Sequence, residues 1–154
     1  MFFFCLTQLT RSILCSGWGR FLLAHVFYCI YFAGAYRKIA AASGLSVLLL
    51  VAVYGGLLLY ILSPYLGALV WPVRVYALVI SVMLLLALYV HVSYHNRASM
   101  LLALGACFFI ISDSVLAINK FYAAFPFAGV VVMSTYGVAQ AFIVSGALRL
   151  PIKE

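Results

Sequence analysis

Long apolar runs, separated by short polar clusters, set the pattern of this 154-residue sequence. Five runs approach or exceed the ~20 residues that a helix needs to cross a bilayer, and they are residues 21–36, 43–63, 72–94, 98–119 and 127–148. Pro64 stops the second run, whereas Pro72 and Pro126 are well placed at helix starts. No strand-like alternation and no internal repeat competes with this pattern. We therefore predict an all-α transmembrane bundle of about five spans, with an irregular or interfacial lead-in over residues 1–20 and a polar tail over residues 149–154.

The composition supports an integral multi-pass membrane protein. The chain is 69% hydrophobic and 7% charged, and its mean hydropathy is +1.26, far from the values of soluble domains. The net charge of +7 comes from basic residues that stand singly or in pairs at the ends of apolar runs, where Lys and Arg anchor helices in a membrane. This pattern argues against nucleic-acid binding. The composition and the positions of the basic residues fit a protein of a bacterial inner membrane or a eukaryotic endomembrane.

The basic residues also predict an orientation. Five of them fall on the side that holds the C-terminus, and they are Arg37, Lys38, Arg97, Arg149 and Lys153. Four fall on the other side, and they are Arg11, Arg20, Arg74 and Lys120. Cytoplasmic loops carry more Lys and Arg than external ones, and Arg74 counts little because it lies inside a predicted helix. We therefore predict a cytoplasmic C-terminus.

Asp113 lies inside the fourth apolar run and is one of only two acidic residues, the other being Glu154. A charge at bilayer depth costs roughly 2.5 to 3.5 kcal/mol on insertion scales, so an intramembrane Asp indicates a functional site. A structural carboxyl is the alternative, with hydrogen bonds from Ser112, Ser114 or a neighbouring helix. Both interpretations require polar partners near Asp113.

Polar side chains of other runs are predicted to lie in the same half of the bilayer as Asp113. Asp113 is about 10 Å along its helix from the Lys120 end. Successive helices alternate in direction, so His25 of the first run and Arg74 of the third start from that same side, and Tyr136 and Gln140 lie near the middle of the last run. Tyr28 lies one turn from His25 on the same helix face. The last run also carries small residues at four-residue multiples, which predict close packing against a neighbour: Gly129, Gly137, Ala141 and Ser145.

Several of these residues have simpler interpretations. Lys120 and Arg74 can anchor their helices at the interface, and His25 alone is typical of an interior histidine. His91 and His95 stand at i and i+4, but no carboxylate or cysteine is near them in the sequence. The four cysteines are scattered through apolar sequence without a CxxC pair. We predict no metal site and no cofactor.

Three segments resemble the lysoplasmalogenase-like, or YhhN-like, family of small multispanning membrane proteins. They are FLLAHVFYCIYF (21–32), GACFFIISDSVLAINKF (105–121) and VMSTYGVAQAFIVSG (132–146), in this order. The resemblance implies an enzyme that hydrolyses the vinyl ether bond of lysoplasmalogen to a fatty aldehyde and a glycerophospho-base. A membrane lipid is then the expected partner, and a homo-oligomer remains open.

The resemblance also implies roles for the polar residues. Asp113 matches a family acid and is predicted to be catalytic together with His25. The predicted substrate-binding residues are Tyr28, Arg74, Ser112, Lys120, Tyr136 and Gln140. A carboxylic acid in an apolar site can protonate the vinyl ether, as glycosidases show for a related oxocarbenium ion.

The sequence departs from the family in one respect. Family members have more spans, and a Gly-Asp motif supplies a second membrane carboxylate on the helix before the His-Tyr segment. Residues 1–19 stand where the end of that region is expected and contain no Asp. We expect that the leading helices are missing and that the chain is weak or inert unless another polypeptide supplies the acid. The alternative function is a small carrier or lipid-binding membrane protein that uses Asp113 as a proton or cation site.

Overall fold

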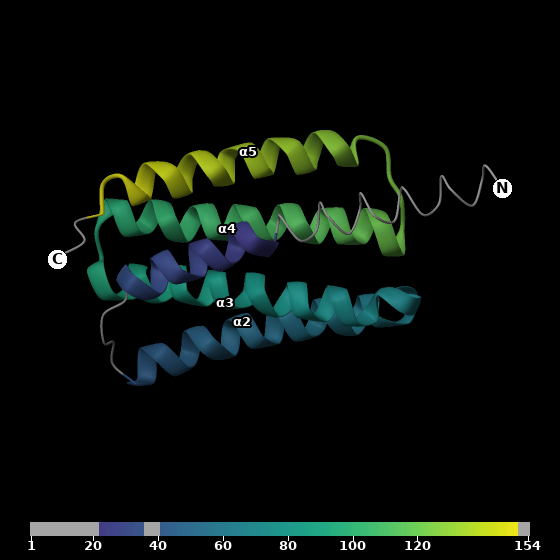
Figure 1. The fold of residues 1–154 in the computed structure, drawn as a ribbon, viewed down its shortest axis with the longest axis horizontal. Helices are drawn as coiled ribbons and strands as arrows, with labels where there is room; N and C mark the ends of the chain where they lie inside the picture. Colours follow the sequence, from purple (N-terminus) through teal and green to yellow (C-terminus); the bar gives the residue numbers. More distant parts are fainter. Residues whose placement is uncertain (1–21, 36–40, 151–154) are drawn as a thin grey trace.

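The computed structural model describes residues 22–35 and 41–150, and within these ranges it is helical without strands (Figure 1). An N-terminal helix (Leu22–Ala35) precedes four longer ones, which are α2 (Ala41–Leu62), α3 (Val70–Tyr94), α4 (Arg97–Ala117) and α5 (Ala128–Ala147). The four longer helices are each long and apolar enough to cross a membrane, and the N-terminal helix is apolar but shorter. The predicted all-α transmembrane class is confirmed.

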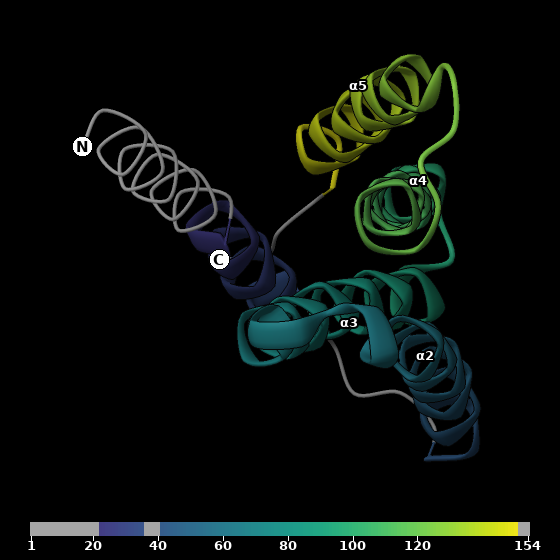
Figure 2. The same ribbon diagram turned by 90° about the vertical axis from the view of Figure 1, so that its right-hand side faces the viewer.

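The connections are tight. Two 3-10 turns, Ser63–Tyr65 and Gly67–Leu69, link α2 to α3. A π-helical turn, η3 (Ile118–Tyr122), extends α4 toward α5, a feature that the sequence did not predict. The view along the helices shows α4 between α3 and α5, with α2 against α3 and the N-terminal helix on the other side of α3 (Figure 2). The N-terminal helix, α3, α4 and α5 therefore share one interior, and α2 packs outside it.

The turn between α3 and α4 sets these two helices side by side. His95 ends α3 in the left-handed conformation at φ +47°, and its backbone N–H donates to the His91 carbonyl at 2.9 Å. Asn96 caps α4: its Oδ1 accepts from the Ser99 N–H at 2.8 Å, and its own N–H donates to Ser99 Oγ at 3.2 Å. A cap of this kind satisfies backbone groups that the helix itself leaves unpaired. The resulting antiparallel pair places residues equally far from the turn at the same depth.

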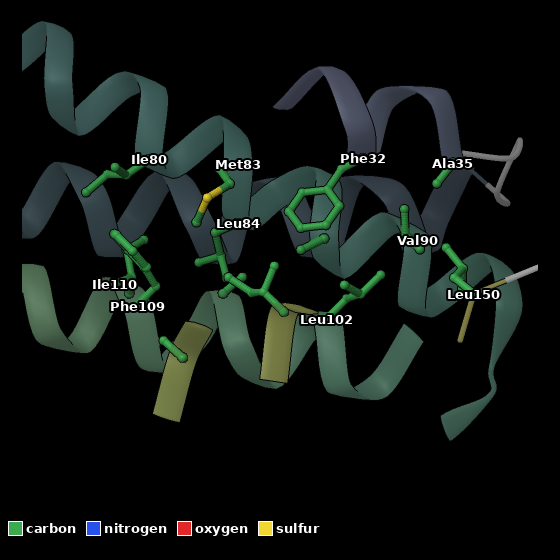
Figure 3. Close-up of a cluster of buried hydrophobic side chains, with 14 of the residues drawn as sticks. Phe32, Ala35, Ile80, Met83, Leu84, Val90, Leu102, Phe109, Ile110 and Leu150 are labelled. Carbon is green, nitrogen blue, oxygen red and sulfur yellow. The ribbon is translucent and has the colours of Figure 1, made fainter. Parts of the chain in front are cut away.

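Large apolar side chains from all four interior helices fill the bundle core. Phe32, Met83, Leu102 and Phe109 are fully buried, and Ile143 of α5 is almost so. Figure 3 shows Phe32 and Met83 above Leu102 and Phe109, from helices far apart in the sequence. The same cluster continues to Val90 and Leu150 near the C-terminal end of the chain. This core holds the polar residues of the interior in fixed positions.

Close contact between α4 and α5 depends on two glycines. A Cβ at Gly105 would lie 2.7 Å from Ile143 Cγ1, and a Cβ at Gly146 would lie 2.8 Å from the Ala98 carbonyl oxygen. The predicted close packing of the small-residue ridge on α5 was wrong, because a Cβ at Gly129 or Gly137 would meet no atom within 4 Å.

The reason lies in the rotation of α5. Its buried residues are Ala128, Ala139, Ile143 and Gly146, and the last three recur at helical spacing on one face. Gly137 and Ala141 each precede a buried residue by two positions, which is roughly half a turn of helix, so they lie on the opposite, exposed face. The spacing identified a real ridge of small residues but could not show which face α4 contacts.

Candidate functional site

Asp113 is buried in α4, and the Tyr76 hydroxyl of α3 donates a hydrogen bond to its Oδ2 atom. Tyr76 precedes the α3–α4 turn by nearly as many residues as Asp113 follows it, so the antiparallel pair brings the two to one depth. The sequence reasoning missed Tyr76. The similar number of residues between the α3–α4 turn and each of Tyr76 and Asp113 was a signal that could have identified Tyr76.

His25 of the N-terminal helix is also buried, with 1% of its surface exposed. Its ring meets three aromatic rings edge-on: Phe109 with centroids 4.6 Å apart, Tyr76 at 5.8 Å and Tyr28 at 6.2 Å. Tyr76 therefore contacts both residues that the sequence predicted as catalytic, one by a hydrogen bond and the other through its ring. Phe109 packs on the same histidine from α4, and it too was missed.

Tyr28 and Gln140 join the N-terminal helix to α5. The Tyr28 hydroxyl donates to Gln140 Oε1 at 2.7 Å. One helical turn earlier on α5, the Tyr136 ring packs edge-on against Phe109 at 5.5 Å. We call this group of predicted and newly found residues the polar cluster: His25, Tyr28, Tyr76, Phe109, Asp113, Tyr136 and Gln140. Four helices contribute to it, so its geometry depends on the whole interior of the bundle.

The two serines beside Asp113 have partners of their own. Ser112 Oγ donates to the Val132 carbonyl of α5 at 3.0 Å. Ser114 Oγ donates to the Ile110 carbonyl at 2.7 Å and also lies 2.7 Å from the Tyr54 hydroxyl of α2. Since Ser114 has one hydroxyl proton, Tyr54 is the donor in the second bond. Ser112 thus links α4 to α5, and the hydrogen bond to Asp113 comes from a neighbouring helix.

Arg74 and Lys120 lie outside the polar cluster. Arg74 is exposed near the start of α3, where its Nη2 donates to Ser63 Oγ at 3.4 Å and its guanidinium lies 5.7 Å from the Trp71 ring centroid. Lys120 is exposed on η3, with Nζ 5.7 Å from the Phe121 ring centroid. Both belong to the same end of the bundle, to which the α2–α3 link and η3 also belong (Figure 1). The structure therefore separates a buried group of predicted residues from an exposed basic pair.

Metal-ligating side chains do not gather in the part of the chain that the structure describes: no three His, Cys, Asp or Glu residues lie close enough to hold an ion. His91 Nδ1 lies 3.3 Å from Ser99 Oγ, at the capped start of α4. The polar cluster itself offers one carboxyl, one imidazole, three phenols and one amide. Such groups can transfer protons and orient a polar ligand.

The YhhN family model matches residues 4–147 of the chain. The chain belongs to the YhhN family. It is 35% identical to lysoplasmalogenase TMEM86B of Mus musculus over 138 residues, which are 88% of this chain and 54% of that protein. It is 33% identical to lysoplasmalogenase TMEM86A of Homo sapiens over 140 residues, 87% of this chain and 56% of that protein.

The chain thus spans about half the length of the curated relatives that it matches. No solved structure matches it. The predicted resemblance to the YhhN family is confirmed, and the family together with the apolar helices makes the chain an integral membrane protein.

Proposed function

We propose that this YhhN-family protein is a membrane hydrolase of the lysoplasmalogenase type, which cleaves the vinyl ether bond of a lysoplasmalogen. Its relatives TMEM86A and TMEM86B are named lysoplasmalogenases. The observation that carries the proposal is the buried carboxyl of Asp113, bonded by Tyr76 beside the buried ring of His25. An ionisable group at this depth is costly and points to function.

The proposed reaction begins with proton transfer from the Asp113 carboxyl to C2 of the vinyl ether, which leaves an oxocarbenium ion at C1. Water adds to C1 and returns one proton to the Asp113 carboxylate. The hemiacetal then breaks the bond between C1 and the glycerol oxygen while its hydroxyl proton passes to that oxygen, giving a fatty aldehyde and the glycerophospho-base alcohol. One water is consumed, and the acid is regenerated.

The neighbours of Asp113 have matching roles in this proposal. The Tyr76 O–H stabilises the carboxylate that remains after proton transfer, since hydrogen bonds to charged groups are the stronger ones. His25 relays the proton of the incoming water toward the Asp113 carboxylate. Tyr28, Tyr136 and Gln140 orient the glycerol and the water, and Ser112 holds α4 against α5 at this depth.

Arg74 and Lys120 are proposed to bind the lipid phosphate. Guanidinium and ammonium groups suit phosphate oxygens, and both residues are exposed at the end of the bundle nearer Asp113. Lys120 lies about 10 Å along the helix axis from Asp113. A glycerol unit between the phosphate and the vinyl ether bridges a separation of this order.

A second carboxylate is part of the related glycosidase mechanism, where it stabilises the cation and activates water. The only other acidic residue of the 154 is Glu154, which follows the last helix. We therefore propose that turnover by this chain is much slower than turnover by its longer relatives, unless another polypeptide supplies the acid.

The test is release of fatty aldehyde from lysoplasmalogen by the purified chain in detergent, beside mouse TMEM86B. The proposal predicts aldehyde from the vinyl ether lipid and none from the saturated alkyl ether analogue. Turnover equal to that of the longer relative would refute the proposed slow turnover of this chain, but would support its proposed hydrolase activity. Absence of aldehyde together with proton-coupled uptake into vesicles would favour the carrier instead.

A further inference from the structure

A small cavity lies against Asp113 on the side of α2. It has a volume of about 40 Å³ and is lined by α2, α3 and α4. Three polar side chains, Tyr76, Asp113 and Ser114, form part of its lining. The rest of the lining is aliphatic and comes from three leucines of α2 together with Val73, Ala77, Ile80 and Ala117.

All three polar groups already have partners. The Tyr76 hydroxyl is bonded to Asp113, and Ser114 Oγ both donates to Ile110 and accepts from Tyr54. Cavities lined mainly by aliphatic side chains stay dry and accept apolar guests, whereas a buried water needs two to four polar partners. The cavity therefore suits hydrocarbon better than water.

The size of the cavity limits the guest. One water-sized guest occupies roughly 10–15 Å³ by this measure, so about 40 Å³ holds a segment of two or three carbons. A longer chain must leave the cavity toward the lipid. On that side only α2 separates the cavity from the lipid, since most of α2 is exposed. Leu57 has 57% of its surface exposed and Tyr60 has 80%.

We propose that this cavity receives C1 and C2 of the lipid chain, so that Asp113 protonates the vinyl ether from the α2 side. The inference rests on the proposed function and adds the site of the hydrocarbon to it. The polar cluster then supplies water from the opposite side, where His25 and Tyr28 belong to the N-terminal helix.

The basic pair agrees with this placement. Arg74 directly follows Val73 of the cavity lining, and Lys120 stands three residues after Ala117, about one turn along α4 and η3. A lysophospholipid has its phosphate a few bonds from the ether oxygen, so the phosphate at the exposed basic pair and C1–C2 in the cavity form one continuous binding mode.

The experiment uses an alkyl ether lysophospholipid with a photoreactive diazirine on C2 of its chain, bound to the purified full chain in detergent. This probe is not hydrolysed, so binding is measured without catalysis. Adducts are mapped by mass spectrometry and competed with unlabelled alkyl ether lysophospholipid. The inference predicts competed adducts within residues 58–62 and 73–80.

The matched variants are Ala77→Leu, which fills the cavity, and Ala33→Leu, which adds the same side chain to the separate 380 Å³ groove between the N-terminal helix and α3. We expect labelling to fall about tenfold in Ala77→Leu, since the lipid chain and the added leucine would compete for one small cavity and weaken binding by about this factor. We expect labelling to stay unchanged in Ala33→Leu. Ala117→Val, a smaller change in the same lining, replaces Ala77→Leu if that variant does not fold.

Competed adducts on the N-terminal helix or α5, adducts that Ala77→Leu leaves undiminished, or no competed adducts at all would overturn the inference. Each of these results is independent of aldehyde release. Competed adducts in the cavity without aldehyde from the vinyl ether lipid would uphold the cavity as a hydrocarbon site and refute the hydrolase.

Discussion

Helices α2 and α4 are both apolar and almost equal in length, with 22 and 21 residues, yet they occupy opposite kinds of environment. α4 lies at the centre of the bundle and buries Ser99, Ser112, Asp113 and Ser114 as well as apolar residues. α2 lies at the edge and exposes most of its leucines. Lipid is as apolar as leucine, so apolar residues do not mark the interior of a membrane protein. Small and polar residues do.

The largest effect on activity is expected from a change at Asp113, at the centre of α4. Asp113→Asn keeps the shape of the side chain but removes the acid, and general acid catalysis contributes about 10²–10⁴-fold. We expect aldehyde release to fall by at least about a hundredfold, with the detergent-solubilised protein still monodisperse. Thr135→Ser in α5 is the control and should retain activity, because it keeps the hydroxyl that donates to the Val131 carbonyl. Near-normal activity in Asp113→Asn would contradict the proposed role of the acid.

The next largest effect on activity is expected at Tyr76 of α3, the hydrogen-bond donor to Asp113 of α4. Tyr76→Phe removes the hydrogen bond to Asp113 and leaves the ring in place. A hydrogen bond to a charged group contributes about 1.5–3 kcal/mol, so kcat should fall about tenfold or more while KM changes little. Tyr89→Phe removes a comparable bond to the Gly44 carbonyl, and its kcat should match that of the unmodified chain. Equal losses in the two variants would show that Tyr76 acts through stability alone.

A third effect tests the packing of α4 on α5. Gly146→Ala places a methyl group 2.8 Å from the Ala98 carbonyl and should cost about 1–3 kcal/mol of unfolding free energy. Gly137→Ala on the same helix meets nothing within 4 Å and should be neutral or slightly stabilising. Thermal unfolding in detergent measures both. A midpoint lowered equally in the two variants would contradict the assignment of the buried face of α5.

The smallest effect belongs to α2. Leu57→Ala removes a side chain that is 57% exposed, and because lipid replaces the lost contacts the stability should change by less than about 0.5 kcal/mol. Leu102→Ala in the fully buried core of α4 should cost about 2–5 kcal/mol. Similar unfolding midpoints for the two variants would remove the distinction between the two helices.

The sequence predicted the helical class and the family because both depend on local signals: apolar runs of bilayer length and three short segments around His25, Asp113 and Gln140. Alternating helix directions also predicted that His25, Asp113 and Gln140 lie at similar depth. The same argument placed Arg74 with them, whereas the structure leaves Arg74 exposed outside the polar cluster. It missed Tyr76 and Phe109, because 25 Phe, Tyr and Trp residues are too many for any one to stand out before the helix rotations are known.

The rest required tertiary structure. The rotation of α5 decides that Gly146 rather than Gly137 meets α4, and no four-residue spacing within one helix can show that. The cavity beside Asp113 exists only between side chains of three helices. The roles of the eight predicted site residues stay predictions.

Proton transfer from Asp113 to carbon is the central claim, and hydrolysis in deuterium oxide tests it most directly. The fatty aldehyde is reduced at once to its alcohol and examined by mass spectrometry. The mechanism predicts a single deuterium on C2 in the product of the unmodified chain, and at least about a hundredfold slower formation of this product by Asp113→Asn. Aldehyde without deuterium on C2, or labelled aldehyde formed equally fast by Asp113→Asn, would contradict it.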